Sequence, residues 1–285
     1  SHVRVLVSTL PLEGGCLGSM KAKLAAAAPN NPAIADVEGQ FVQVMPYSEA
    51  SSQALLNGLQ AKHGRTLPQD HVSVILERSN AVQTPLFLVT LFSEAMHWRS
   101  YTPSAEIPAF ACLSMPDLIN CIFDKLLKTH GETTINTALG LITAARFGLT
   151  NNEMEDLLSL NDGVLHEVFE WWTPPVQRLP PLLWARVSSD LSGAFVHRET
   201  ESSVAAPVVT WYHRQWRETA QARFLDQMEA VGWRCKELAV YFEGSHPNGA
   251  ARKVNPQLNF NSSGFINLRK MSELPHALLH SNQYP

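Results

Sequence analysis

The sequence has few cysteines, no cluster of positive charge and no long hydrophobic run. Its four cysteines lie far apart, so no CxxC pair and no cysteine–histidine group has the spacing of zinc ligands: Cys16, Cys112, Cys121 and Cys235. The formal net charge is −4 and the basic residues are scattered, which argues against a nucleic-acid partner. No apolar stretch approaches the roughly 20 residues that cross a bilayer, and the N-terminus lacks a signal-peptide pattern. We expect a soluble, cytoplasmic protein with reduced thiols, no membrane partner and no metal site.

The composition is that of a globular protein. Apolar residues make up 45% of the 285 residues and charged residues 17%, with seven tryptophans and twelve phenylalanines. A chain of this length exceeds the usual size of one domain, so two or three modules are expected. The sequence does not begin with methionine and starts in an apolar, β-branched run, which we interpret as the beginning of a piece of a longer protein.

The first 46 residues have the pattern of an α/β sheet. "VRVLVSTLP" (Val3–Pro11) and "FVQVMP" (Phe41–Pro46) are short, apolar and rich in valine, as buried parallel strands are. Between them, "GSMKAKLAAAAPNN" is a run of helix formers that ends at a proline–asparagine breaker. Because two strands cannot form such a domain alone, residues 1–46 are predicted to be the last strands of a larger core.

Residues 47–130 have the pattern of a small helical bundle. Four amphipathic segments follow one another with short predicted connections, and the first opens with Ser48 as a cap. Residues 131–227 mix helices with two strands. Gly148 is predicted to stop one helix, and Thr150 and Glu153 stand in capping-box register for the next.

Two strands and further helices complete the predicted fold. "AFVHRETE" and "APVVTWYH" are predicted to form a hairpin after several helices, which is the layout of a winged helix. Residues 228–285 hold another helix, a linker at 245–264 rich in Asn, Pro, Gly and Ser, and a final helical segment. The predicted fold class is mainly α with minor β: a remnant of a P-loop α/β sheet, a helical bundle, a winged helix and the start of linker helices.

This order of modules, together with several stretches, resembles the C-terminal half of a NACHT-type STAND ATPase module. The stretches that carry the resemblance are "PLFLVTLFSEAMHWRSY", "ALGLITAARFGLTNNEMEDLLSL", "LPPLLWARV", "WYHRQWRETAQARFL" and "NLRKMSELPHALL". They are similar to segments of NACHT and WD-repeat proteins and, more distantly, of telomerase-associated and nephrocystin-3-like proteins. The resemblance implies a P-loop core, a helical domain and a winged helix that close around ADP, then open and oligomerise when ATP replaces it.

The resemblance also implies what this chain does not carry. The GxxxxGK[ST] loop and the acidic strand that holds Mg²⁺ belong upstream of residue 1, so ADP or ATP would bind with Mg²⁺ supplied by that upstream core. The chain alone is expected not to hydrolyse ATP. No catalytic residue is proposed, because His166, His197 and His213 lie on segments of different type and form no hydrolytic triad by pattern.

His213, in "WYHR", matches the winged-helix histidine that contacts the β-phosphate of ADP in this family. A strand end that faces a helix start can hold an imidazole against an anion, and a nearby phosphate favours the protonated form. The alternative is a core histidine, next to Trp211 and Tyr212, whose ring bonds to a backbone carbonyl.

The resemblance reaches three other residues. Pro85, in "TPLFL", matches the proline that packs on the adenine ring, although Gln83 stands where the family usually has glycine; alternatively, Pro85 only begins a helix. Ser8 and Thr9 end the first predicted strand at the position of the γ-phosphate sensor, where many relatives have Arg or Asn. Alternatively, they form a strand end and a turn.

Two other groups of residues are given structural interpretations. Five tryptophans are predicted to pack in the core or between domains instead of forming a stacking platform for bases: Trp171, Trp172, Trp184, Trp211 and Trp216. Arg214, Arg217 and Arg223, interrupted by Glu218, are predicted to form a solvated helix face.

Three functions are compatible with these features. The first is the regulatory lid of a NACHT-type ATPase that holds ADP when closed and opens to allow oligomeric assembly. Its partners would be the upstream P-loop core, a downstream repeat region, further copies of itself and other proteins. The second is a structural adaptor that works without nucleotide. The third is a winged-helix module for nucleic acid, which the acidic balance disfavours.

Overall fold

The computed structural model describes residues 16–27, 41, 45, 47–199, 207–260 and 264–281. The chain divides into two compact units, Ser1–Pro46 and Tyr47–Pro285. In the first unit, helix α1 (Cys16–Ala27) forms where the sequence predicts a helix between two strands. Those two predicted strands lie outside the described residues, except for Phe41 and Met45, which are not in a strand.

The described part of the second unit is mainly helical and contains a small sheet, so the predicted class, mainly α with minor β, is confirmed. Its α-helices are α2 (Glu49–His63), α3 (Gln69–Val82), α4 (Pro85–Ala95), α5 (Met115–His130), α6 (Glu132–Ala144), α7 (Asn151–Leu160), α8 (Asp162–Val168), α9 (Pro181–Asp190), α10 (Arg214–Phe224), α11 (Met228–Glu243) and α12 (Leu268–His280). Its strands are β1 (Leu149–Thr150), β2 (Phe195–Arg198) and β3 (Val208–Trp211).

Helices α2, α3 and α4 pack side by side, and their ends follow local signals. The hydroxyl of Ser48 accepts the amide of Ser51 at 3.2 Å and so caps α2, as the sequence predicts. Gly64 ends this helix in the left-handed conformation. The connection from α4 to α5 is longer than predicted, because it carries two 3₁₀ turns, η4 (Ser104–Glu106) and η5 (Pro108–Ala111).

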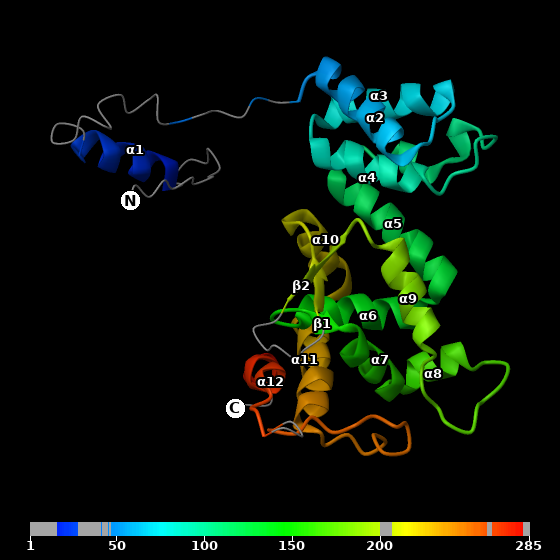
Figure 1. The fold of residues 1–285 in the computed structure, drawn as a ribbon, viewed down its shortest axis with the longest axis vertical. Coiled ribbons are helices and arrows are strands. Elements are labelled where there is room, and N and C mark those ends of the chain that lie inside the picture. The colour runs from blue at the N-terminus through cyan, green and yellow to red at the C-terminus, as the bar shows by residue number, and fades with distance from the viewer. Residues whose placement is uncertain are drawn as a thin grey trace. The chain divides into compact units, whose positions relative to one another are not determined.

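Helix α5 joins these helices to the rest of the second unit (Figure 1). Towards α4, Lys125 donates to the carboxylate of Glu94 at 2.9 Å. At the last residue of α5, Nε2 of His130 lies 2.7 Å from a carboxylate oxygen of Asp190 in α9. Polar contacts therefore hold α5 to both of its neighbours.

The sheet is antiparallel, with the strand order β1-β3-β2. Phe195 pairs with Trp211 and Arg198 pairs with Val208, which confirms the predicted hairpin. On its other side β3 pairs with the short strand β1, where Leu149 lies opposite Val209. Strand β1 was not predicted from the sequence.

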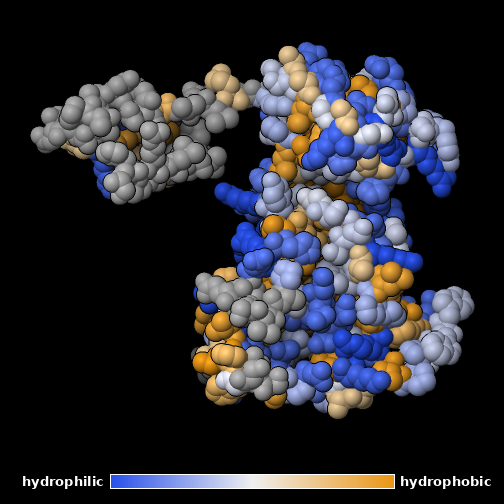
Figure 2. Space-filling view, viewed as in Figure 1, coloured by the Kyte–Doolittle hydropathy of each residue, from blue (hydrophilic) through white to orange (hydrophobic). Residues whose placement is uncertain are grey.

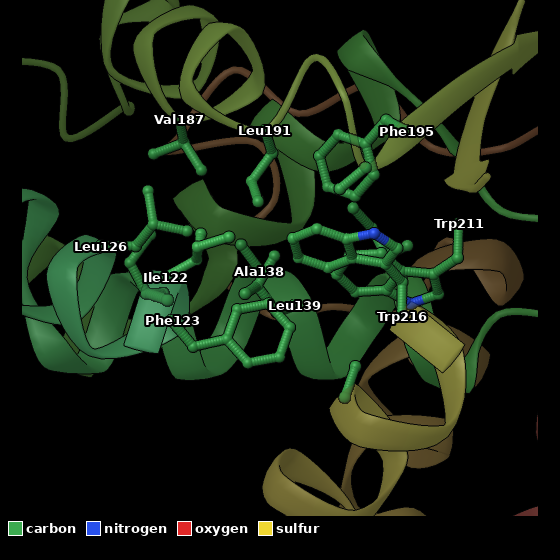
Figure 3. Close-up of a cluster of buried hydrophobic side chains, with 14 of the residues drawn as sticks. Ile122, Phe123, Leu126, Ala138, Leu139, Val187, Leu191, Phe195, Trp211 and Trp216 are labelled. Carbon is green, nitrogen blue, oxygen red and sulfur yellow. The ribbon is translucent and has the colours of Figure 1, made fainter. Parts of the chain in front are cut away.

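A cluster of apolar side chains lies between this sheet and the surrounding helices (Figure 3). Trp211 from β3 and Phe195 from β2 contact each other with ring centroids 5.0 Å apart, and Phe123 from α5 lies 5.8 Å from Trp216 of α10. The buried side chain of Trp184 adds to the cluster from α9. Packing is therefore confirmed for three of the five tryptophans.

The other two tryptophans, Trp171 and Trp172, are exposed and not packed as predicted. Trp171 is 93% exposed and Trp172 is 68% exposed. Helix α8 ends at Val168, so both side chains fall in the segment before α9 and not on a packed helix face. The prediction that these two residues pack in the core is wrong.

Helices α11 and α12 pack together at the end of the described chain. The large hydrophobic side chains of Leu268, Met271 and Leu279 in α12 remain exposed, and Figure 2 shows hydrophobic side chains at the edge of the molecule where α12 lies. On the other side of α12, Arg269 and Glu273 are buried. Among the described residues, no helix is long and apolar enough to cross a membrane.

Candidate functional site

His213 lies at the junction between β3 and α10, where the sequence analysis placed it. The strand ends at Trp211, and the amide of Tyr212 donates to the carbonyl of Ala194 at 2.8 Å, which fixes the chain as it leaves the sheet. His213 then has extended backbone angles, φ −127° and ψ 148°, and is the N-cap of α10.

Two buried tryptophans hold this junction in place. Trp211 precedes His213 and Trp216 follows it in the first turn of α10, and their rings are stacked with centroids 6.2 Å apart. The indole N–H of Trp211 also donates to the hydroxyl of Thr143 in α6 at 3.0 Å. Because both flanking side chains are buried, the exposed ring of His213 projects from a fixed backbone.

The imidazole of His213 caps α10 through one nitrogen. Its Nδ1 accepts the backbone amide of Gln215 at 3.2 Å, which satisfies one of the free N–H groups of the first turn. An Nδ1 that accepts a hydrogen bond puts the proton of the neutral ring on Nε2. Among the described residues no group is a hydrogen-bond partner of Nε2, so this donor faces solvent.

The alternative of a core histidine is wrong. The side chain of His213 is exposed, and the partner that the structure gives it is an amide donor, not the backbone carbonyl that a buried ring would need. The exposed position follows from the local pattern: buried Trp211 and Trp216 face the apolar cluster, and the residues between them, at the start of α10, face outward.

The charges around the start of α10 favour an anion. The first turn contains no acidic residue, and both Arg214 and Arg217 are exposed there. Arg214 pairs with Glu218 at 2.6 Å, which offsets part of the positive charge at this end of α10. The positive end of the helix dipole adds to the attraction for a negative group.

Arg223 differs from the other two arginines of α10. It donates to the carbonyl and the side-chain oxygen of Asn120, both at 3.2 Å, and to a carboxylate oxygen of Asp124 at 2.5 Å. The prediction that Arg223 belongs to a solvated face is therefore wrong, because this residue fixes α10 against α5.

A cavity of about 520 Å³ lies between α5 and α10. Its lining residues are Pro116, Asn120, Gln215, Glu218, Thr219, Ala222 and Arg223. Gln215, whose amide His213 accepts, is one of them, whereas His213 itself and Pro85 are not. In the described parts of the chain, no group of three or more His, Cys, Asp or Glu side chains is arranged to hold a metal ion.

Pro85 is exposed at the first position of α4, as the structural alternative predicted. Two residues earlier, Gln83 ends α3 with φ +56°, in the left-handed region that favours glycine. The resemblance implies a glycine at this position, and the conformation observed here is one that glycine adopts without strain. Ser8 and Thr9 lie outside the described residues.

A buried group of charged residues was not predicted from the sequence. Arg269 of α12 contacts the carboxylates of Glu153 and Glu273, and all three residues are at most 8% exposed. Glu153 was assigned only a capping role. No local signal reveals the pairing, because Arg269 lies 116 residues away in the sequence.

Comparison with known proteins bears out the resemblance. The chain is 32% identical over 261 residues to human NACHT domain- and WD repeat-containing protein 1 and 31% identical to its mouse counterpart, and each match covers 85% of this chain. It is 26% identical over 262 residues to mouse NACHT and WD repeat domain-containing protein 2, which covers 90% of the chain. The chain spans only 16% of the first two relatives and 14% of the third. No protein-family model matches the chain, and no solved structure matches it.

Proposed function

We propose that this chain is the regulatory lid of a NACHT-type ATPase, which holds ADP in a closed state and opens on exchange for ATP to allow oligomeric assembly. The observation that carries the proposal is the geometry of His213: an exposed imidazole on a fixed backbone, at the positive end of α10, whose Nε2 faces solvent. The relatives supply the context, because proteins named for a NACHT domain and WD repeats match most of the length of this chain.

The residues present fit a phosphate group. The Nε2–H of His213 can donate to a phosphate oxygen while Nδ1 continues to cap α10, and Arg214 and Arg217 lie in the same turn. Such a charge-assisted hydrogen bond contributes about 1.5–3 kcal/mol, or roughly a tenfold to hundredfold change in affinity. A contact made only in the closed state would shift the equilibrium towards that state.

The connectivity of the second unit supports the assignment of a winged helix. After α6, the chain forms β1, α7, α8 and α9, followed by the hairpin of β2 and β3, with β3 in the middle of the sheet. In the proposed lid, this module presents His213, and Pro85 at the start of α4 packs on the adenine ring. Ser8 and Thr9 remain proposed contacts of the γ-phosphate, and Mg²⁺ would be held by the upstream core.

A nucleic-acid-binding winged helix is disfavoured by α9. In such modules the helix before the hairpin enters the major groove and needs cations for the phosphate backbone. Within α9, Arg186 is the only basic residue, and Asp190 ends the helix. The adaptor that needs no nucleotide stays the main competing function, and one experiment separates the two.

The test is the nucleotide content of the longer protein, with its upstream region restored, purified without added nucleotide and then denatured. We expect ADP to co-purify with the unsubstituted protein. His213→Ala and His213→Ser should both lose it, because serine restores the cap of α10 but not the imidazole. His197→Ala, at an exposed histidine of β2, is the matched control and should retain ADP.

Two outcomes would contradict the proposal. If the unsubstituted protein carries no nucleotide, the chain is a scaffold. If His213→Ser retains ADP while His213→Ala loses it, His213 acts only by capping α10, and the phosphate contact is wrong.

A further inference from the structure

Two thiols of the second unit lie on neighbouring elements at a cavity that the proposed function does not use. Cys112 follows η5 and is 6% exposed, whereas Cys121 is half-buried in the second turn of α5. Helix α5 packs directly on η5. A cavity of about 570 Å³ runs along this junction, and its wall includes Cys121 together with Pro108 and Ala109 of η5.

The surroundings give the two thiols different roles. The thiol of Cys112 points back into its own turn and donates weakly to the carbonyl of Pro108 at 3.9 Å. Burial, together with the neighbouring Cys121, raises the pKa of Cys112 to about 12. Burial also raises the pKa of Cys121, and the charges of Glu94 and Asp124 add to this, whereas the interaction with Cys112 and the charge of Lys125 act in the opposite direction.

We propose that Cys112 and Cys121 form a dithiol that a hydroperoxide converts into an intrachain disulfide, with Cys121 attacked first through the cavity and Cys112 as the resolving thiol. The thiolate of Cys121 attacks one peroxide oxygen, so that an S–O bond forms and the O–O bond breaks. The departing oxygen takes a proton and leaves as an alcohol or water. The cavity wall carries charges of both signs, Lys125 and Lys128 beside Glu94 and Asp124, and Lys125 is paired with Glu94 at 2.9 Å.

The second step closes the disulfide. The sulfur of Cys112 attacks the sulfenic sulfur of Cys121, the S–S bond forms, the S–O bond breaks, and the hydroxyl leaves with the thiol proton as water. Overall, two thiols lose two electrons to one hydroperoxide. The new bond ties the end of η5 to α5 and so fixes one wall of the cavity. Because the reactive species is the thiolate and the pKa of Cys121 is raised, the reaction should become faster as pH rises.

The other cysteines provide the controls. Cys235 is buried, its pKa is raised to about 11 by burial, and no other thiol contributes to that shift. Cys16 is exposed in the first unit, so Cys16→Ser gives a background with fewer intermolecular disulfides. The 285-residue chain in this background is treated with hydrogen peroxide, alkylated under denaturing conditions, digested and analysed by mass spectrometry.

We expect a peptide pair joined through Cys112 and Cys121, formed on the order of tenfold faster than any oxidation of Cys235. In Cys112→Ser, a sulfenic acid at Cys121 should be trapped by dimedone. In Cys121→Ser, Cys112 should stay reduced. The proposal fails if Cys235 reacts as fast as Cys121, or if Cys121 is oxidised in the parent chain without pairing to Cys112.

A second measurement uses the chain without these substitutions, so its result does not depend on whether the cysteine variants fold correctly. Phenylarsine oxide joins two adjacent thiols, forming two As–S bonds and releasing one water. One equivalent should therefore protect both Cys112 and Cys121 from alkylation in the native chain and leave Cys235 unprotected. If neither thiol is protected, the two sulfur atoms are too far apart and the proposal is wrong.

Discussion

Arg269 donates to both carboxylate oxygens of Glu153, from Nε at 3.0 Å and from Nη2 at 2.9 Å, and so holds the first turn of α7 against α12. Its Nη1 lies 3.2 Å from Glu273, which in turn accepts the amides of Arg146 and Phe147 at 2.9 and 3.0 Å. Burial opposes the charge of Arg269, but its hydrogen bonds with Glu153 and the charges of both carboxylates raise its pKa. The network therefore ties the last described helix to the turn between α6 and α7.

Removal of this arginine should be severely destabilising. Arg269→Met leaves the buried carboxylates of Glu153 and Glu273 without their cation, so we expect the free energy of unfolding to fall by about 3–5 kcal/mol. Urea denaturation of the 285-residue chain measures this loss. Lys236→Met, on the exposed face of the neighbouring α11, is the control and should change stability by no more than about 0.5 kcal/mol. Equal effects of the two substitutions would show that the buried charges are solvated or paired in another way.

Structural features that depend on a few neighbouring residues could be predicted from the sequence. The predicted capping box of α7 is present in both directions, since Glu153 donates its amide to Thr150 at 3.1 Å and its carboxylate accepts the amide of Thr150 at 2.8 Å. The hairpin of β2 and β3 was predicted for the same reason, because alternation and turn residues are local features. At the candidate site, the position of His213 at a strand end and a helix start was predicted.

Features that join distant segments could not be predicted from the sequence. Strand β1 has two residues, too few for a recognisable pattern, and it exists because Leu149 pairs with Val209 in β3. The capping bond of His213 could not be predicted either, because it depends on the rotation of one side chain. Trp171 was misassigned because composition favours burial of tryptophan, whereas the end of α8 decides whether burial is possible.

A carboxylate from α8 caps α6 and should make stability depend on pH. Glu167 accepts the amides of Thr133 and Thr134 at 2.9 and 2.8 Å and the hydroxyl of Thr134 at 2.6 Å. Partial burial acts against the charged form, but these hydrogen bonds dominate and lower the pKa of Glu167. A folded-state pKa below the unfolded one means that the stabilisation is present at neutral pH and is lost as pH falls through the folded pKa.

Glu167→Gln should therefore lower the free energy of unfolding at pH 7 by about 1 kcal/mol, a modest value because the side chain is partly solvated. The difference from the unsubstituted chain should shrink as urea denaturation is repeated below the usual pKa of glutamate. Glu170→Gln changes an exposed carboxylate two residues beyond the end of α8 and is the matched control. A difference that stays constant with pH would rule out the charge of Glu167 as the cause.

Gly148 allows β1 to approach β3. Its φ is +92°, and a Cβ at this position would collide with the carbonyl oxygen of Val209 and come within 3.0 Å of Thr210. We expect Gly148→Ala to lower the free energy of unfolding by about 2 kcal/mol or more, because the backbone of two strands must separate. Gly58→Ala is the contrasting control, since the exposed Gly58 of α2 has open space around it and alanine should stabilise the helix by about 0.5–1 kcal/mol. If the midpoint temperature of thermal unfolding shifts in the same direction for both variants, this explanation is wrong.

Gln83 holds a left-handed conformation for which glycine is better suited, two residues before the proposed nucleotide contact Pro85. Its φ of +56° strains a side chain with a Cβ, while its amide still donates to the carbonyl of Ser79 at 2.8 Å to end α3. Gln83→Gly relieves the strain but gives the unfolded chain more freedom, so we expect a net stabilisation of up to about 1 kcal/mol. Ala81→Gly, in the last turn of α3, should have the opposite sign, because glycine destabilises a helix interior by up to about 1 kcal/mol. If chemical denaturation shows that both glycine variants are destabilised equally, the left-handed conformation of Gln83 carries no strain. Glutamine at this position would then not weaken the junction of α3 and α4.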